Sequence, residues 1–141
     1  MTICTQGRKL LFGEIVGSEM VLNEYGRVVG ECWEWLTRQY PYVQLDKWVV
    51  MPNHIHGIIV LGGSRTAPTD KQKSLSSIVG AFKTVSTGSI NRLRRSPGVP
   101  IWQRNYYEHI IREEEDLDHV RQYLIYNPGR WAEDEENPFR R

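Results

Sequence analysis

The pattern of apolar residues predicts a β-hairpin in the middle of the chain. An apolar run covers residues 49–61, and its polar interruptions are Pro52-Asn53 and two histidines. Proline presets the backbone of the first turn position and asparagine tolerates the second, so this pair is expected to join a strand over 43–50 to a return strand. Because side chains alternate between the two faces of a strand, His54 and His56 are expected to project from the same face.

Three helices are predicted where apolar residues recur every three or four positions. The first covers residues 23–40 and has Asn23 in the position of an N-cap. The second covers 74–93, where Gly88 weakens the helical pattern and a break is expected. The third opens at the acidic run 113–116, whose carboxylates suit the positive end of a helix dipole.

Short strands are predicted at residues 2–5, 101–103 and 106–112, while the stretch between residue 10 and the first helix is expected to be irregular. The resulting order is strand, helix, hairpin, helix, strand, helix. An antiparallel sheet with helices packed on one face, in a βαββαβ-like arrangement, satisfies this order with short connections. The predicted fold class is therefore α+β.

Composition is that of one soluble domain covering residues 1–141, with 40% hydrophobic and 25% charged residues. Within it, residues 62–73 are expected to form a flexible polar loop and 129–141 a tail. The sequence has neither an apolar run of membrane-spanning length nor the order of a signal peptide, so a cytoplasmic protein without membrane contact is expected. Cys4 and Cys32 are too few for a disulfide framework and are expected to be core thiols.

Charge is unevenly distributed along the chain. Residues 71–104 carry seven basic and no acidic side chains, and since the whole chain carries +1, the remainder carries −6. A block of this sign attracts polyanions, although a solvated helix face has the same appearance. The candidate contacts to a DNA backbone are Lys83, Arg92, Arg94, Arg95 and Arg104.

The third helix supplies partners for the two histidines. Tyr123 and Asn127 are four positions apart, so they share one helix face beside the apolar stripe that is expected to pack on the sheet. Two neutral imidazoles and an amide oxygen bind a divalent ion and leave positions open for substrate oxygens. This mixed set is compatible with Mg²⁺ or Mn²⁺, and imidazole alone also accepts Zn²⁺. Such an ion polarises a phosphodiester, and the tyrosine hydroxyl is the candidate nucleophile.

Three segments together resemble a known family. Residues 51–56, Met-Pro-Asn-His-Ile-His, resemble the histidine-hydrophobic-histidine (HUH) motif of single-strand DNA transposases that use one catalytic tyrosine. Residues 102–104 followed by 107–112, and then residues 123–128, are most similar to the REP-associated tyrosine transposase branch. The resemblance covers roughly residues 2–128. Members have residues before the segment matching 2–5, so the first strand is expected to be short.

The resemblance implies a ferredoxin-like or RRM-like fold with a C-terminal catalytic helix. It implies Mg²⁺ or Mn²⁺ on His54, His56 and Asn127, and attack by Tyr123 to give a 5′-phosphotyrosine and a free 3′-OH. The implied partner is single-stranded DNA with a REP-like hairpin, bound by a monomer or a homodimer.

Other interpretations of the same residues stay open. The histidines are also compatible with a half-exposed structural strand, and Tyr106, Tyr107 and Tyr126 compete with Tyr123 as nucleophile. His109 is expected to be a hydrogen-bonded structural residue. Asp46 is expected to lie on the surface of the hairpin, with a metal-site carboxylate as the alternative. The alternative functions are a non-catalytic RRM-like nucleic-acid-binding module and an HUH replication initiator or relaxase.

Overall fold

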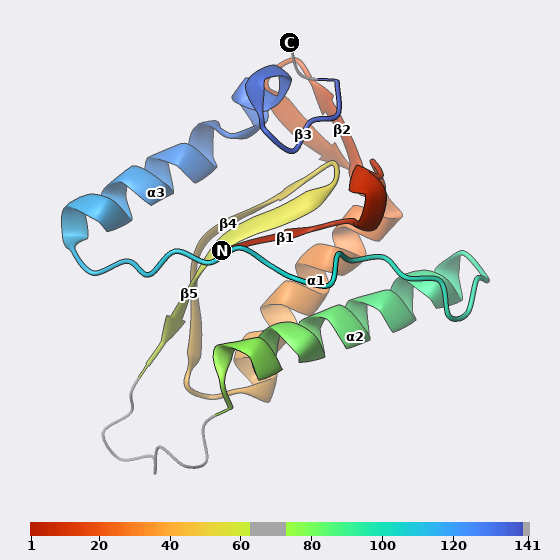
Figure 1. Cartoon of the computed structure of the whole chain (residues 1–141), viewed down its shortest axis with the longest axis horizontal. Coiled ribbons are helices and arrows are strands. Elements are labelled where there is room, and N and C mark those ends of the chain that lie inside the picture. The colour runs from red at the N-terminus through yellow and green to blue at the C-terminus, as the bar shows by residue number, and fades with distance from the viewer. Residues whose placement is uncertain (63–72, 140–141) are drawn as a thin grey trace.

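The computed structural model describes residues 1–62 and 73–139 (Figure 1). Its main sheet is antiparallel, with the strands in the order β1 (Thr2–Cys4), β5 (His54–Leu61) and β4 (Val43–Met51). The β4–β5 hairpin turns at Pro52-Asn53, which confirms the sequence prediction. A short 3-10 turn, η1 (Gln6–Arg8), follows β1.

Residues 101–107 lie along the outer edge of β1 without forming a regular strand. They make two isolated antiparallel bridges, Thr5 with Trp102 and Thr2 with Tyr107. The strands predicted at 101–103 and 106–112 are therefore wrong, because β1 is three residues long and offers few backbone partners. Counting this segment as an edge, the order is that of a ferredoxin-like α+β fold, which confirms the predicted class.

A second, two-stranded sheet precedes the first helix. It consists of β2 (Gly13–Val16) and β3 (Glu19–Leu22), where an irregular stretch was predicted. Gly17 turns the chain between them with a φ of 64°, a left-handed conformation that glycine adopts without steric cost. The Gly17-Ser18 pair between two apolar runs is the sequence signal for this hairpin.

Helices α1 (Glu24–Gln39) and α2 (Leu75–Leu93) pack together on one face of the main sheet (Figure 1). Asn23 caps α1 as predicted, since its Oδ1 accepts a hydrogen bond from Gly26 N at 2.9 Å. Helix α2 continues through Gly88 without the predicted break. The buried side chains of both helices, the sheet and the residues that pack beside them form one core, which includes Ile3, Phe12, Val29, Cys32, Trp33, Leu36, Val50, Ile55, Ile78, Val79, Phe82, Ile90 and Trp102.

At Gly57 the sheet and α1 approach each other closely. A Cβ atom at this position would lie 2.8 Å from Trp48 Cβ and 2.9 Å from Trp33 Cζ2. Only glycine lets the Trp33 ring rest against the backbone of β5. Cys4 and Cys32 are both buried free thiols, as predicted.

Helix α3 (Glu114–Tyr126) and a following 3-10 segment, η3 (Pro128–Glu133), lie across the sheet from α1 and α2 (Figure 1). The region predicted as a tail therefore contains η3, which packs beside α3 and the β2–β3 hairpin. The predicted loop 62–73 falls outside the described residues apart from its two ends. Within the described part of the chain, no helix is both long and apolar enough to cross a membrane.

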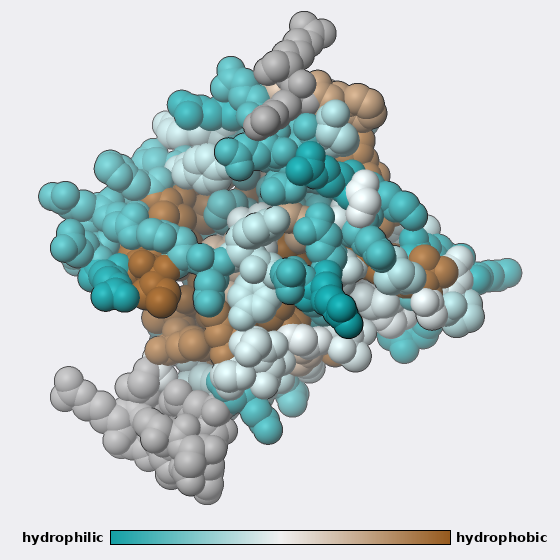
Figure 2. Space-filling model, in the orientation of Figure 1, coloured by the Kyte–Doolittle hydropathy of each residue, from teal (hydrophilic) through white to brown (hydrophobic). Residues whose placement is uncertain are grey.

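One face of the molecule is mostly hydrophilic, with a hydrophobic area below α3 (Figure 2). The apolar side chains near that area line a small cavity of about 390 Å³ between the end of β5, residues 108–111 and α3. This cavity contains neither of the two candidate histidines.

Candidate active site

The strand register places both histidines on the sheet face that α1 and α2 leave open. Cys4 lies opposite His54 and Thr2 lies opposite His56, so these four side chains share one face. Ile55, between the histidines, points into the core and is 1% exposed. The alternation predicted from the sequence therefore holds.

His54 is held in one tautomer by Asn53. The Asn53 side-chain amide donates to the Glu136 carbonyl at 2.6 Å, so its Oδ1 is left to accept a hydrogen bond. His54 Nδ1 lies 2.9 Å from that oxygen and must carry the proton. The lone pair of His54 is consequently on Nε2. Burial lowers the pKa of His54 to about 4, so the ring is neutral at neutral pH.

His56 is also neutral at neutral pH. Burial, followed by the positive N-terminal ammonium and His54, lowers its pKa to about 3. Its Nδ1 lies 3.3 Å from Thr2 Oγ1. The ammonium of Met1 is fixed nearby, because it donates to the Gly57 carbonyl at 3.1 Å. Two neutral imidazoles are suitable metal ligands.

Helix α3 brings Tyr123 to the histidines. The ring centroids of Tyr123 and His56 are 5.4 Å apart at an interplanar angle of 54°. Burial and the negative charges of Asp134, Glu135 and Glu136 raise the pKa of Tyr123. The hydroxyl is therefore protonated at neutral pH and is a weak nucleophile unless a cation lies close to it.

An ion pair anchors α3 to the sheet. Arg121 Nε and Nη2 donate to the two carboxylate oxygens of Asp46 at 2.8 and 2.6 Å. Asp46 lies where the β4–β5 register shifts between Leu45 and Trp48, and the Arg121 hydrogen bond lowers its pKa to about 2. Asp46 is therefore a partner of α3, and its carboxylate oxygens are both occupied by Arg121.

The histidines and Tyr123 line one cleft of about 610 Å³. The segment after η3 closes one side with three carboxylates that sequence reasoning missed, because the acidic run at 133–136 has the composition of a solvated tail. Tyr107 also lines the cleft, whereas Tyr106 lies beside the Lys83 ammonium, 5.9 Å from ring centroid to Nζ. The cleft residues are Thr2, Arg8, His54, His56, Tyr107, Tyr123, Asp134, Glu135 and Glu136.

Asn127 is placed differently from the other candidates. It ends α3, is 2% exposed, and does not line the cleft. Its Nδ2 is buried without a hydrogen-bond partner among the described residues. His109, as expected, is hydrogen-bonded: its Nε2 lies 2.8 Å from Asp116 Oδ2 at the surface.

The donor set of the cleft fits a divalent ion. His54 offers a free Nε2 lone pair, and Asp134 offers a buried Oδ2 that no described residue contacts by a hydrogen bond. Mixed nitrogen and oxygen ligands of this kind suit first-row divalent ions and Mg²⁺. Within residues 1–62 and 73–139, however, no three His, Cys, Asp or Glu side chains are already gathered around an ion-sized space.

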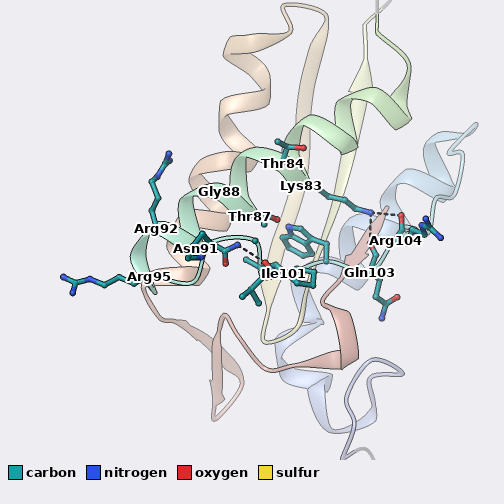
Figure 3. A pocket seen from close by; sticks show the side chains of 15 residues that line it. Lys83, Thr84, Thr87, Gly88, Asn91, Arg92, Arg95, Ile101, Gln103 and Arg104 are labelled. Atoms are coloured by element: carbon teal, nitrogen blue, oxygen red, sulfur yellow. Dashed lines mark hydrogen bonds between the residues drawn. The ribbon is translucent and has the colours of Figure 1, made fainter.

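The five basic candidates divide into two groups, and Figure 3 shows four of them, Lys83, Arg92, Arg95 and Arg104. Lys83 Nζ donates to the carbonyls of Gln103, Arg104 and Asn105 at 2.8 to 3.2 Å, and burial lowers its pKa. Arg94 Nε donates to Asn91 Oδ1 at 2.9 Å. The remaining three, Arg92, Arg95 and Arg104, are exposed and line a groove of about 910 Å³ along the second half of α2.

Together, the sheet order and the cleft define a ferredoxin-like α+β protein that carries a histidine pair on one strand and a tyrosine on a C-terminal helix. A solved structure of a REP-associated tyrosine transposase bound to a REP hairpin has the same fold, with a TM-score of 0.64. It is 23% identical over 90% of this chain, and this chain spans 63% of its length. At that identity the likeness shows the fold alone.

The sequence comparison identifies a nearer relative. A protein of Haemophilus influenzae (strain ATCC 51907 / DSM 11121 / KW20 / Rd), described as an uncharacterized protein, is 35% identical over 147 residues. The match covers 96% of this chain and 82% of that protein. The chain belongs to the same family as the Haemophilus protein. No established family profile matches the sequence.

Proposed function

We propose that this chain is a metal-dependent nuclease and strand transferase for single-stranded DNA, of the tyrosine transposase kind. The observation that carries this proposal is the meeting of His54, His56 and Tyr123 in one cleft, with the Tyr123 ring 5.4 Å from that of His56. A histidine pair without a nucleophile would serve a structural metal equally well. The adjacent phenol adds a group that can attack phosphorus.

Each residue has a distinct role in the proposed reaction. His54 and His56 would hold Mg²⁺ or Mn²⁺ together with Asn127, whose amide would have to turn from its buried position outside the cleft toward the ion. The ion would act as a Lewis acid on the phosphodiester and favour the phenolate. Tyr123 Oη attacks phosphorus and the 3′ oxygen leaves, which gives a 5′-phosphotyrosine and a free 3′-OH. The phenolic proton passes to water and the departing 3′ oxygen takes a proton from water, because imidazoles with pKa values of about 4 and 3 are too weakly basic to take the proton efficiently.

Reversal of the same step rejoins DNA strands. The phosphotyrosine link keeps the energy of the phosphodiester, so a 3′-OH that enters the cleft can attack it and release Tyr123. Because Tyr123 and His56 meet within one chain, the structure supports cleavage in cis by a single subunit, with a homodimer as the alternative.

The proposed substrate is single-stranded DNA flanked by a REP-like hairpin. The solved structure with the same fold is bound to a REP hairpin. In this chain the groove with Arg92, Arg95 and Arg104 supplies exposed cations for backbone phosphates. Lys83 and Arg94, the other two candidates, contribute mainly by shaping that groove.

A labelled oligonucleotide tests the reaction and its polarity. A hairpin-bearing single strand is incubated with the protein and Mn²⁺ and resolved on a denaturing gel. A 3′ label is expected in the covalent adduct, and a 5′ label only in the released fragment. Tyr123→Phe is expected to abolish the adduct.

Two matched variants make the result specific. Tyr126→Phe changes an exposed tyrosine on the same helix and is expected to leave the yield unchanged, and Tyr107→Phe examines the other tyrosine of the cleft. Equal adduct yield in Tyr123→Phe and in the unaltered protein would remove Tyr123 from its proposed role.

A second candidate is a nucleic-acid-binding module without catalysis, and the arginine groove on the opposite side of the sheet from the histidines favours it. This module would bind the same oligonucleotide with equal affinity after His54 and His56 are both replaced by alanine. It would form no adduct in any variant.

A further inference from the structure

The chain returns to the histidine face directly after η3. Asp134 ends this 3-10 segment, and its N–H donates to the Trp131 carbonyl at 3.1 Å. Its Oδ1 accepts a hydrogen bond from Glu136 N at 2.8 Å, and its own carbonyl accepts one from Asn137 N at 3.0 Å. The Trp131 ring also lies against His54, with centroids 6.3 Å apart. Hydrogen bonds to residues before and after it in the chain therefore fix the position of Asp134.

The second carboxylate oxygen of Asp134 has no hydrogen-bond partner among the described residues. Oδ2 is buried and lies 3.9 Å from His54 Nε2, and the two side chains are 4% and 2% exposed. A buried carboxylate oxygen without a partner is costly, and nearly all such groups in proteins are paired or bind an ion. Glu135 and Glu136 follow in the chain and line the same cleft, which adds negative charge.

The tautomer of His54 makes the approach of its Nε2 atom to Asp134 Oδ2 unfavourable without a cation between them. Its Nδ1–H is used by Asn53, so the Nε2 lone pair faces Asp134 Oδ2. At 3.9 Å the two atoms are too far apart for a hydrogen bond, even if the carboxyl is protonated. Ligand bonds of about 2.0–2.2 Å to a divalent ion span up to about 4.2 Å, so one ion fits between the two atoms.

We propose that Asp134 is a direct ligand of the divalent ion held by the histidines. The inference rests on the proposed function, which assigns the oxygen ligand of that ion to the amide of Asn127. A carboxylate contributes more to cation affinity than an amide does, because it brings a negative charge to a buried site. Asp134 lies outside the segments between residues 51 and 128 that resemble the tyrosine transposases.

Mn²⁺ binding in the absence of DNA tests the assignment. The full-length protein is freed of metal, and its affinity for Mn²⁺ is measured by titration calorimetry and by the electron paramagnetic resonance signal of free Mn²⁺. Asp134→Asn keeps the shape of the side chain and is expected to weaken binding by at least about ten-fold. Glu133→Gln removes the same charge from an exposed residue that does not line the cleft and is expected to change affinity by less than about two-fold.

Thermal unfolding supplies an independent readout. Without metal, Asp134→Asn is expected to raise Tm, since it removes a buried unpaired charge. With Mn²⁺, Tm of the unaltered protein is expected to rise by more than that of Asp134→Asn. Equal or tighter Mn²⁺ binding by Asp134→Asn would overturn the proposal, as would an unaltered protein that binds no Mn²⁺. The Tyr123 adduct judges the proposed function separately. An adduct together with unchanged Mn²⁺ affinity in Asp134→Asn overturns this proposal alone, and weakened Mn²⁺ binding in Asp134→Asn without any adduct overturns the proposed function alone.

Discussion

Gly57→Ala should destabilise the protein through a clash between the new Cβ atom and the side chains of Trp48 and Trp33. The new Cβ would lie 2.8 Å from Trp48 Cβ and 2.9 Å from Trp33 Cζ2, whereas carbon atoms prefer about 3.5 Å or more. Trp33 cannot yield, since it is 1% exposed and packs edge-on against Phe82 with ring centroids 5.3 Å apart. Strand β5 cannot slide either, because Gly57 N donates to the Met1 carbonyl at 3.0 Å.

The magnitude follows from two opposing effects. Overpacking of a dense core costs about 1–3 kcal/mol. Replacement of a strand glycine by alanine recovers about 0.5–1 kcal/mol of backbone entropy. A net loss of about 1–2 kcal/mol in the free energy of unfolding is therefore expected, which corresponds to roughly 0.5–1 M in the urea midpoint at a typical m value.

Gly80→Ala in α2 is the matched control. A Cβ there meets nothing within 4 Å, so the variant is expected to gain up to about 1 kcal/mol from helix propensity. Both variants are measured by urea denaturation followed by circular dichroism. A Gly57→Ala midpoint at or above that of the unaltered protein would refute the packing argument.

Three further outcomes are expected. The folded-state pKa of His54, about 4, is below the unfolded value of 6.5. The metal-free protein is therefore most stable above pH 6.5 and is expected to lose about 3 kcal/mol of unfolding free energy through this residue as the pH falls to 4. Urea denaturation between pH 7 and pH 4 measures this loss. Asp46→Asn removes the carboxylate that holds α3 through Arg121. Adduct formation by Tyr123 should then slow several-fold in the labelled-oligonucleotide assay, while the urea midpoint changes little. An unchanged rate of adduct formation would contradict this reasoning. Lys83→Met leaves three carbonyls without their donor and should cost about 1–3 kcal/mol in the same denaturation assay, whereas Arg92→Met, at an exposed position, should cost almost nothing.

Elements with a strong local pattern could be predicted from the sequence. The capped amphipathic helix α1, the β4–β5 hairpin and the acidic start of α3 each follow from residues within a few positions of one another. The β2–β3 hairpin was missed although Gly17-Ser18 marks its turn. The break predicted in α2 does not occur because Phe82 and Ile90, on either side of Gly88, are both fully buried, and their packing outweighs the roughly 1 kcal/mol cost of a helix glycine.

The candidate site could be predicted only in part. Strand alternation places His54 and His56 on one face. Helical spacing pairs Tyr123 with Asn127, and of this pair only Tyr123 lines the cleft. The approach of Asp134 to His54 depends on how η3 turns back to the sheet, and no local pattern determines that turn. Likewise, net charge predicts a basic surface, but the tertiary contacts of Lys83 and Arg94 decide which cations are free to meet a ligand.

The two walls of the cleft differ in how firmly they are attached to the rest of the molecule. Helix α3 buries a single side chain, Leu124, and is otherwise held at the sheet by the Arg121–Asp46 pair, whereas β5 is hydrogen-bonded to a strand on each side. Amide hydrogens of α3 are therefore expected to exchange with solvent through local opening, long before those of β5, which exchange only on global unfolding. We therefore expect the wall that carries Tyr123 to open more readily than the wall that carries the histidines, which would give the single-stranded DNA of the proposed reaction a way into the cleft.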